Sequence, residues 1–132
     1  MAEQHRLDPV GRPYDPAGLH PKPEVGVEGF LALDLRVGRV LEVAPFPEAR
    51  HPAYRLRVDF GPVIGTLATS AKITSYSPEE LQGRQVVGAV NLGSKRIAGF
   101  VSEFLILGGL EPDGTVRLLE VDTDLAPGSV IA

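Results

Sequence analysis

The segment from Asn91 to Phe104 mixes charged and hydroxyl side chains with apolar ones, in a part of the chain that otherwise reads as core. It runs NLGSKRIAGFVSEF and lies between two strongly apolar stretches. Lys95 and Arg96 carry cationic groups that can hold carboxylates or phosphates, while Ser102 and Glu103 can form hydrogen bonds or ion pairs. The chemistry that this pattern indicates is ligand binding.

The residues that usually perform acid-base, nucleophilic or metal chemistry are not arranged for it. His5, His20 and His51 lie in a proline-rich arm or turn, without acidic or histidine neighbours at metal-ligand spacing. Cysteine is absent, as are the glycine-containing motifs of serine hydrolases and of nucleotide-binding loops. We therefore predict a protein that is not an enzyme, with no catalytic residue, no metal site and no cofactor.

Two further segments contribute to a candidate binding surface. In residues 63–74 one strand face would present small or polar side chains, among them Ser70 and Lys72. In residues 99–107 each face is apolar with one polar member, and Ser102 is one of these. The predicted peptide- or RNA-binding residues are Ser70, Lys72, Asn91, Lys95, Arg96, Phe100, Ser102 and Phe104.

Two interpretations of Ser102 and Glu103 stay open at this point. In the first, Glu103 pairs with a nearby arginine or lysine and Ser102 bonds to the backbone, because buried polar groups are normally satisfied internally. In the second, both lie at the edge of a groove with an apolar floor, whose rim carries Lys72, Lys95 and Arg96.

The elements that must position these groups are strands. Residues 53–60, AYRLRVDF, alternate apolar even positions with charged odd positions, which predicts a half-buried strand with its apolar side chains inward. Residues 33–43 form another long strand, in which Gly38 is expected to mark a bend. Further strands are expected at 63–73, 86–91, 99–107 and 115–121.

Turns and one short helix separate these strands. Residues 77–81, SPEEL, combine an N-cap serine, a proline at the first helical position and a glutamate at the third, and Gly83 ends this helix. Lys95 and Arg96 are expected in the turn between the fourth and fifth strands, and residues 108–109 in another turn. The order predicts an all-β fold: a five-stranded Greek-key OB-fold barrel with one short helix after strand 3 and terminal extensions. A β-sandwich has similar strand spacing and is the alternative.

Composition and charge narrow the class of protein. The 132 residues suffice for one domain, which we place at 30–132, after a Pro/Gly-rich N-terminal arm at 1–29. The net charge is −4, although residues 30–100 hold nine basic and six acidic residues, against one and six in 101–132. An acidic balance argues against binding nucleic acid by bulk electrostatics and leaves room for a local basic face.

The same features predict a cytoplasmic protein without membrane insertion. The lack of cysteine fits a reducing compartment, and no apolar run approaches the roughly 20 residues of a membrane span. The first sixteen residues contain no apolar segment of the secretory type, so we expect no signal peptide.

Several blocks of the sequence together resemble the tRNA-binding-domain superfamily of OB-fold modules, which are appended to methionyl- and phenylalanyl-tRNA synthetases or exist as free dimers. The blocks are DLRVGRVLEV (34–43), SAKIT (70–74), VVGAVNL (86–92) and KRIAGFVSEFLILGG (95–109). The variant PEARHPAYRLRVDFG (47–61), with SEFLILGG at 102–109, is more similar to the free-standing CsaA-type proteins, which are described as export-associated chaperones. The resemblance covers about residues 30–132, the domain that we call tRNA-binding-like.

The sequence also departs from the synthetase-appended relatives. They usually have Asn-Ala-Asp-Lys-Leu where this chain has residues 48–52, and Ser-Gln-Gly-Met where it has Ser102-Glu103-Phe104-Leu105. The second site belongs to the surface associated with tRNA contact in those relatives, and here it gains a negative charge and a bulky aromatic side chain. The family pattern is still matched by Asn91, Lys95, Arg96 and Ser102.

Two functions follow as hypotheses. The resemblance implies a homodimer with an apolar cavity that accepts peptides, hence a small ATP-independent chaperone whose partner is unfolded or preprotein polypeptide. The alternative is a structure-selective tRNA-binding protein that uses the basic middle segment. The acidic last 32 residues and the small number of aromatic side chains favour the peptide hypothesis. The apolar segment 118–131 is expected to add to the barrel of the partner subunit.

Overall fold

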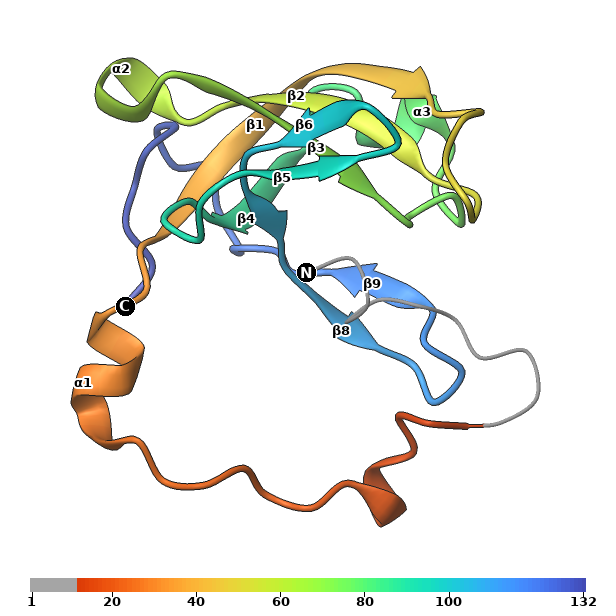
Figure 1. The fold of residues 1–132 in the computed structure, drawn as a ribbon. Coiled ribbons are helices and arrows are strands. Elements are labelled where there is room, and N and C mark those ends of the chain that lie inside the picture. Colours follow the sequence, from red (N-terminus) through yellow and green to blue (C-terminus); the bar gives the residue numbers. More distant parts are fainter. Residues whose placement is uncertain (1–11) are drawn as a thin grey trace.

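The computed structural model describes residues 12–132 of the chain. Predictions for residues 1–11, including His5 and the first part of the arm, lie outside the described residues. The rest of the arm contains a single 3-10 turn, η2 (Pro16–Gly18), and a short helix, α1 (Gly26–Leu31), neither of which has a buried residue. The N–H of Tyr14 donates a hydrogen bond of 3.0 Å to the carbonyl of Pro112, and the arm extends beneath the barrel in Figure 1.

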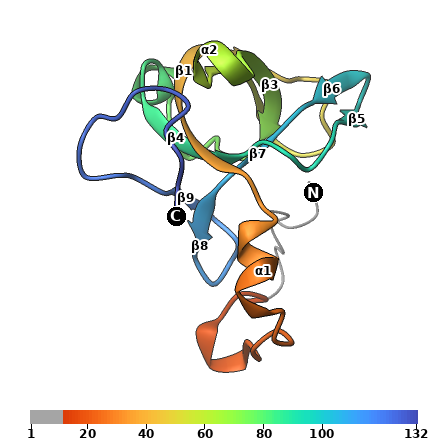
Figure 2. The ribbon, with the colours of Figure 1, turned by 90° about the vertical axis from the view of Figure 1, so that its left-hand side faces the viewer.

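Five strands form an antiparallel sheet that curls into a nearly closed barrel (Figures 1 and 2). Their order in the sheet is β3-β2-β1-β4-β7, so β3 and β7 are its two edges. The strands are β1 (Leu35–Pro45), β2 (Tyr54–Asp59), β3 (Thr66–Ala71), β4 (Gln85–Ala89) and β7 (Leu105–Ile106). This arrangement confirms the predicted OB-type barrel.

Two small hairpins accompany the barrel and correct the expected strand limits. β5 (Lys95–Ile97) pairs with β6 (Phe100–Ser102), and β8 (Gly108–Leu110) pairs with β9 (Val116–Leu118). The single strand predicted at 99–107 is therefore broken, and Lys95, Arg96 and residues 108–109 lie in strands, not turns. The β5–β6 turn is made by Ala98 and Gly99, both with positive φ (48° and 81°). Two such residues make the two-residue turn that hairpins prefer, and Ala-Gly is a weak sequence signal for it.

The β8–β9 hairpin is held by polar contacts across its turn. The carboxylate of Asp113 accepts a hydrogen bond of 2.9 Å from the N–H of Thr115, which lowers the pKa of Asp113. Glu111 accepts a hydrogen bond from Arg117 at 2.5 Å, which raises the pKa of Arg117. Asp113 and Arg117 are both exposed, so these contacts define the turn and add little stability.

Of the two short helices between the strands, the sequence predicts α3 and not α2. α3 (Pro78–Leu81) has the predicted capping box: Ser77 Oγ accepts from the N–H of Glu80 at 3.1 Å, and Glu80 Oε1 accepts from the N–H of Ser77 at 2.8 Å. Residues 61–64 form the helix α2 (Gly61–Ile64), so the strand predicted from residue 63 begins three residues later. Within residues 12–132, no helix is long and apolar enough to cross a membrane.

The core lies inside the barrel, and Gly38 is needed to pack it. Val58 and Phe60 are almost fully buried, as their even positions predicted. A Cβ at Gly38 would lie 2.5 Å from Val58 Cγ1 and 2.7 Å from Phe60 Cε1. The irregularity in β1 comes later, where its register with β2 shifts between Val40 and Glu42. Gly38 therefore serves close packing, and a β-bulge provides the change in strand direction.

Residues 128–131 of the C-terminal segment pack along β1 of their own chain. The addition of 118–131 to a partner's barrel stays a prediction. The N–H of Val37 donates to the carbonyl of Ser129, and the N–H of Ile131 donates to the carbonyl of Leu35, at 2.8 and 2.9 Å. This is possible because the first half of β1 pairs only with β4, so its other edge is open to residues 128–131.

Candidate functional site

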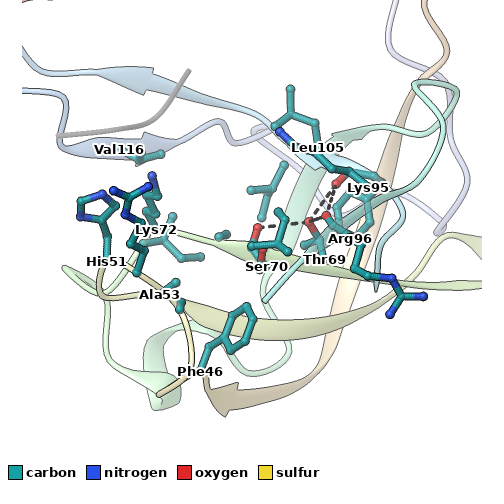
Figure 3. A pocket seen from close by; sticks show the side chains of 18 residues that line it. Phe46, His51, Ala53, Thr69, Ser70, Lys72, Lys95, Arg96, Leu105 and Val116 are labelled. Atoms are coloured by element: carbon teal, nitrogen blue, oxygen red, sulfur yellow. Dashed lines mark hydrogen bonds between the residues drawn. The ribbon is translucent and has the colours of Figure 1, made fainter. Parts of the chain in front are cut away.

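A cavity of about 270 Å³ opens where the barrel is incompletely closed (Figure 3). It lies between β3, the β5–β6 hairpin, β7 and the loop of residues 46–53. Its floor is apolar and includes Ala71, Ile73, Phe104 and Ile106, which are buried, together with the ring of Phe46. A cavity with such a floor excludes water from an apolar side chain placed in it.

The rim of this cavity is basic. Five of the eighteen lining residues carry cationic or titratable basic groups, and none of the eighteen is an aspartate or a glutamate. The five are Arg50, His51, Lys72, Lys95 and Arg96. In a chain with a net charge of −4, this lining concentrates one sign of charge around an apolar depression. The arrangement attracts anionic groups to its mouth.

The cavity exists because the barrel is closed at one end only. Glu103 joins the two sheet edges there: its N–H donates to the carbonyl of Ala68 at 2.8 Å, and its carboxylate accepts from the N–H of Ala68 at 2.9 Å. The carboxylate of Glu103 is therefore satisfied by backbone and not by an arginine or lysine, and the residue is exposed. Beyond Glu103, β3 and β7 form no ladder with each other.

Two buried hydroxyls lie beside this closure and face the cavity. Thr69 Oγ1 donates to the carbonyl of Phe104 at 2.8 Å and lies 2.9 Å from Ser102 Oγ. Both side chains are about 2% exposed. Their hydrogen bonds satisfy the hydroxyl protons without solvent, which settles how Ser102 is accommodated next to the core.

Arg55 connects the two walls of the cavity. Its guanidinium carbon lies 5.5 Å from the centroid of the Phe46 ring and 5.8 Å from that of Phe100, and the two rings meet edge to face at 5.6 Å. Phe46 belongs to the 46–53 loop and Phe100 to β6. The stack therefore holds the loop and the hairpin at a set distance.

The structure brings most of the predicted binding residues together. Six of the eight line the cavity: Ser70, Lys72, Lys95, Arg96, Ser102 and Phe104. Phe104 also packs into the core, with its ring 4.9 Å from that of Phe60. Phe100 does not line the cavity, but its ring packs edge to face against that of Phe46, which does. Asn91 lies elsewhere: its amide accepts from the N–H of Asp34 and donates to the carbonyl of Ala32, both at 2.8 Å.

Sequence reasoning missed several lining residues. Phe46, Arg50 and His51 come from the 46–53 loop, in which the sequence predicts only a proline-bounded turn, and Thr69 is on neither predicted binding face. The available signal was the pair of adjacent basic residues, Arg50 and His51, in an exposed loop. Among residues 12–132, no group of three or more His, Asp or Glu side chains could hold a metal ion. The apolar floor and basic rim of the cavity suit it to binding a ligand.

An OB barrel with an apolar, basic-rimmed cavity defines a class of binding modules. Comparison with known proteins places the chain in a family of this class. Residues 35–130 match the family described as "Putative tRNA binding domain". The chain belongs to this tRNA-binding-domain family, and the resemblance to its CsaA-type members is confirmed by solved structures.

Those structures are named as CsaA chaperones. The protein from Bacillus anthracis str. Ames is 47% identical with a TM-score of 0.79, and that from Picrophilus torridus is 41% identical with a TM-score of 0.78. Each comparison covers 83% of this chain and 100% of the other.

Curated relatives include methionine–tRNA ligases, of which this chain spans only a small part. It is 38% identical over 108 residues to the ligase of Porphyromonas gingivalis strain ATCC 33277 and 36% identical over 107 residues to that of Xylella fastidiosa strain M23. These matches cover 82% and 80% of this chain, but 16% and 15% of the ligases.

Proposed function

We propose that this protein is a small ATP-independent chaperone that binds exposed segments of unfolded or export-bound polypeptide in the cytoplasm. The observation that carries the proposal is the cavity, whose floor is apolar and whose described lining residues include five basic ones and no aspartate or glutamate. The similarity to proteins named as CsaA chaperones supports the same assignment.

The cavity suits a segment that combines an apolar side chain with a nearby carboxylate. An apolar side chain gains about 25 cal/mol for each Å² that it removes from water on the floor. Charge-assisted hydrogen bonds from the rim, which includes Arg50 and Arg96, hold the carboxylate. Contacts of this kind, in an open site, correspond to dissociation constants of about 1 μM.

Binding of tRNA is the second candidate, because the matched family is described as a tRNA-binding domain and the same rim can contact phosphates. The two functions differ in salt dependence. Each neutralised phosphate steepens the fall of affinity with salt, whereas burial of an apolar side chain is nearly independent of it. The acidic C-terminal region, with six acidic residues and one basic residue in 101–132, favours polypeptide.

The test is a titration of the protein with unfolded, signal-bearing peptides and with tRNA at two salt concentrations. We expect peptides to bind with a weak salt dependence. Ala49→Trp places a large ring in the cavity from a half-buried lining position and should reduce peptide affinity about tenfold or more. Val63→Trp, at a 91% exposed position that does not line the cavity, is the matched control and should bind normally. Peptides that release no heat and do not compete, alongside tight, salt-sensitive tRNA binding, would overturn the proposal.

A further inference from the structure

The open edge of β3 has a backbone that faces the cavity. β3 pairs with β2 in unbroken register from Asp59↔Thr66 to Tyr54↔Ala71. Along an antiparallel strand, the N–H and C=O of successive residues point alternately toward one neighbour and the other. The N–H and C=O of Ala68 both bond to Glu103, away from β2. Two residues further on, those of Ser70 therefore also point away from β2.

The backbone of Ser70 has little to bond to in this position. Within the described residues, its N–H has no hydrogen-bond partner, and its carbonyl is approached only by Thr69 Oγ1, at 3.3 Å. Ser70 is half-buried and lines the cavity, as Figure 3 shows. The opposite sheet edge, β7, does not pair with β3. A donor and an acceptor on a strand edge, side by side in an apolar depression, form a ready template for another extended chain.

We propose that the client segment binds as an added strand on the edge of β3, pairing through its backbone with the N–H and C=O of Ser70. This inference rests on the proposed function and names how the cavity recognises its client. The occupant is an extended polypeptide with alternating apolar and acidic residues. Its apolar side chains enter the floor, and its carboxylates meet the rim that contains Arg50 and Arg96.

Backbone pairing also fits what a chaperone must recognise. Every unfolded polypeptide carries the same N–H and C=O groups, so strand addition gives affinity without a fixed sequence, while pockets for alternate side chains give a preference. The charge of the lining supplies that preference here, because the lining residues among 12–132 include five basic ones and no aspartate or glutamate. A lysine-rich segment would place like charges together and bind less well.

The decisive experiment is an N-methyl scan of one acidic, apolar octapeptide that binds the wild-type protein. A methyl group on a peptide nitrogen removes one donor and blocks close pairing at that residue only. We expect methylation at the one residue whose N–H donates to the Ser70 carbonyl to weaken binding about tenfold, and methylation at the other residues to change it less than twofold. The effect should be confined to one position, because the N–H and C=O of the neighbouring outward-facing residue, Ala68, are already bonded to Glu103. Equal effects at all positions, or none, would overturn strand addition.

A matched pair of protein variants tests the same contact from the other side. Ser70→Pro removes the N–H that faces the cavity, and Ser70→Ala removes only the hydroxyl. Proline is tolerated on edge strands where its nitrogen faces outward, so β3 can accommodate it. We expect Ser70→Ala to bind the octapeptide within twofold of wild type and Ser70→Pro to bind about tenfold more weakly. Equal affinities for the two folded variants would contradict the inference.

The outcomes separate this inference from the function on which it rests. Tight binding of the octapeptide with no response to methylation would leave the proposed function standing and remove strand addition. No binding of any peptide would overturn both. Should Ser70→Pro fail to fold, which circular dichroism would reveal, the methyl scan on the wild-type protein decides alone.

Discussion

At the scale of single residues, the most informative side chain is Thr69. Its hydroxyl is 2% exposed and joins the two edges of the barrel next to the cavity, through Phe104 and Ser102. Hydrogen bonds in such surroundings matter chiefly because their loss leaves buried partners unsatisfied. Thr69 therefore closes the barrel with a side chain where a backbone ladder is missing.

We predict that Thr69→Val lowers the free energy of unfolding by about 1–2 kcal/mol, since valine keeps the shape but leaves the Phe104 carbonyl and Ser102 Oγ without this partner. Urea unfolding monitored by circular dichroism measures the change. Thr66→Val is the matched control, because Thr66 lies on the same strand and is exposed. A loss no larger for Thr69→Val than for Thr66→Val would show that the hydroxyl contributes nothing to closure.

At the scale of elements, the cavity depends on how the 46–53 loop and the β5–β6 hairpin are held relative to β2. Arg55, on β2, lies against Phe46 of the loop and Phe100 of the hairpin. Neither segment belongs to the five-stranded sheet. A single side chain thus links two elements whose sequence positions are about fifty residues apart.

We predict that Arg55→Leu loosens both segments and weakens peptide binding several-fold, because each cation–π contact contributes about 0.5–1 kcal/mol. Hydrogen exchange should become faster in residues 46–53 and 95–102 and stay unchanged in β1. Arg57→Leu, on the same strand but exposed and paired with Glu42 at 2.7 Å, should leave both segments as in wild type. Unchanged exchange in Arg55→Leu would refute this role.

At the scale of the whole molecule, the described part of the arm leaves apolar surface uncovered. Val27 and Leu31 of α1 are 65% and 70% exposed, and Val25 just before the helix is 71% exposed. A six-residue helix with no buried side chain is not stable by itself in water. A second copy of the chain is the partner that we propose for this surface, in keeping with the homodimer that the family resemblance implies.

We predict that the protein sediments at twice the 14.1 kDa of one chain at micromolar concentration. Phe30→Glu together with Leu31→Glu should shift it toward the monomer, because charges would have to be buried in the interface. Val63→Glu, at a 91% exposed position on α2, should leave the dimer intact. A wild-type species of one chain's mass under these conditions would rule out a stable dimer.

Local patterns in the sequence determined the parts of the fold that depend on neighbours along the chain. Alternation over 53–60 placed Leu56, Val58 and Phe60 in the core, and Ser77 with Glu80 formed the predicted capping box. The same patterns failed at residues 61–64 and 95–110. There, positive φ at Ala98 and Gly99 and the hydrogen bonds of Glu103 to β3 set the strand limits.

The set of residues that line the cavity depends on the tertiary structure. Arg50, His51, Lys95 and Arg96 line one rim only because the barrel curls. Asn91 fits the family pattern equally well, but its side chain bonds to residues 32 and 34. The direction of the Ser70 N–H and C=O, away from β2, is likewise invisible in the sequence, because every residue except proline carries the same N–H and C=O. Sequence determines what groups the chain carries, and only barrel closure determines which of them face a common space and which remain unpaired.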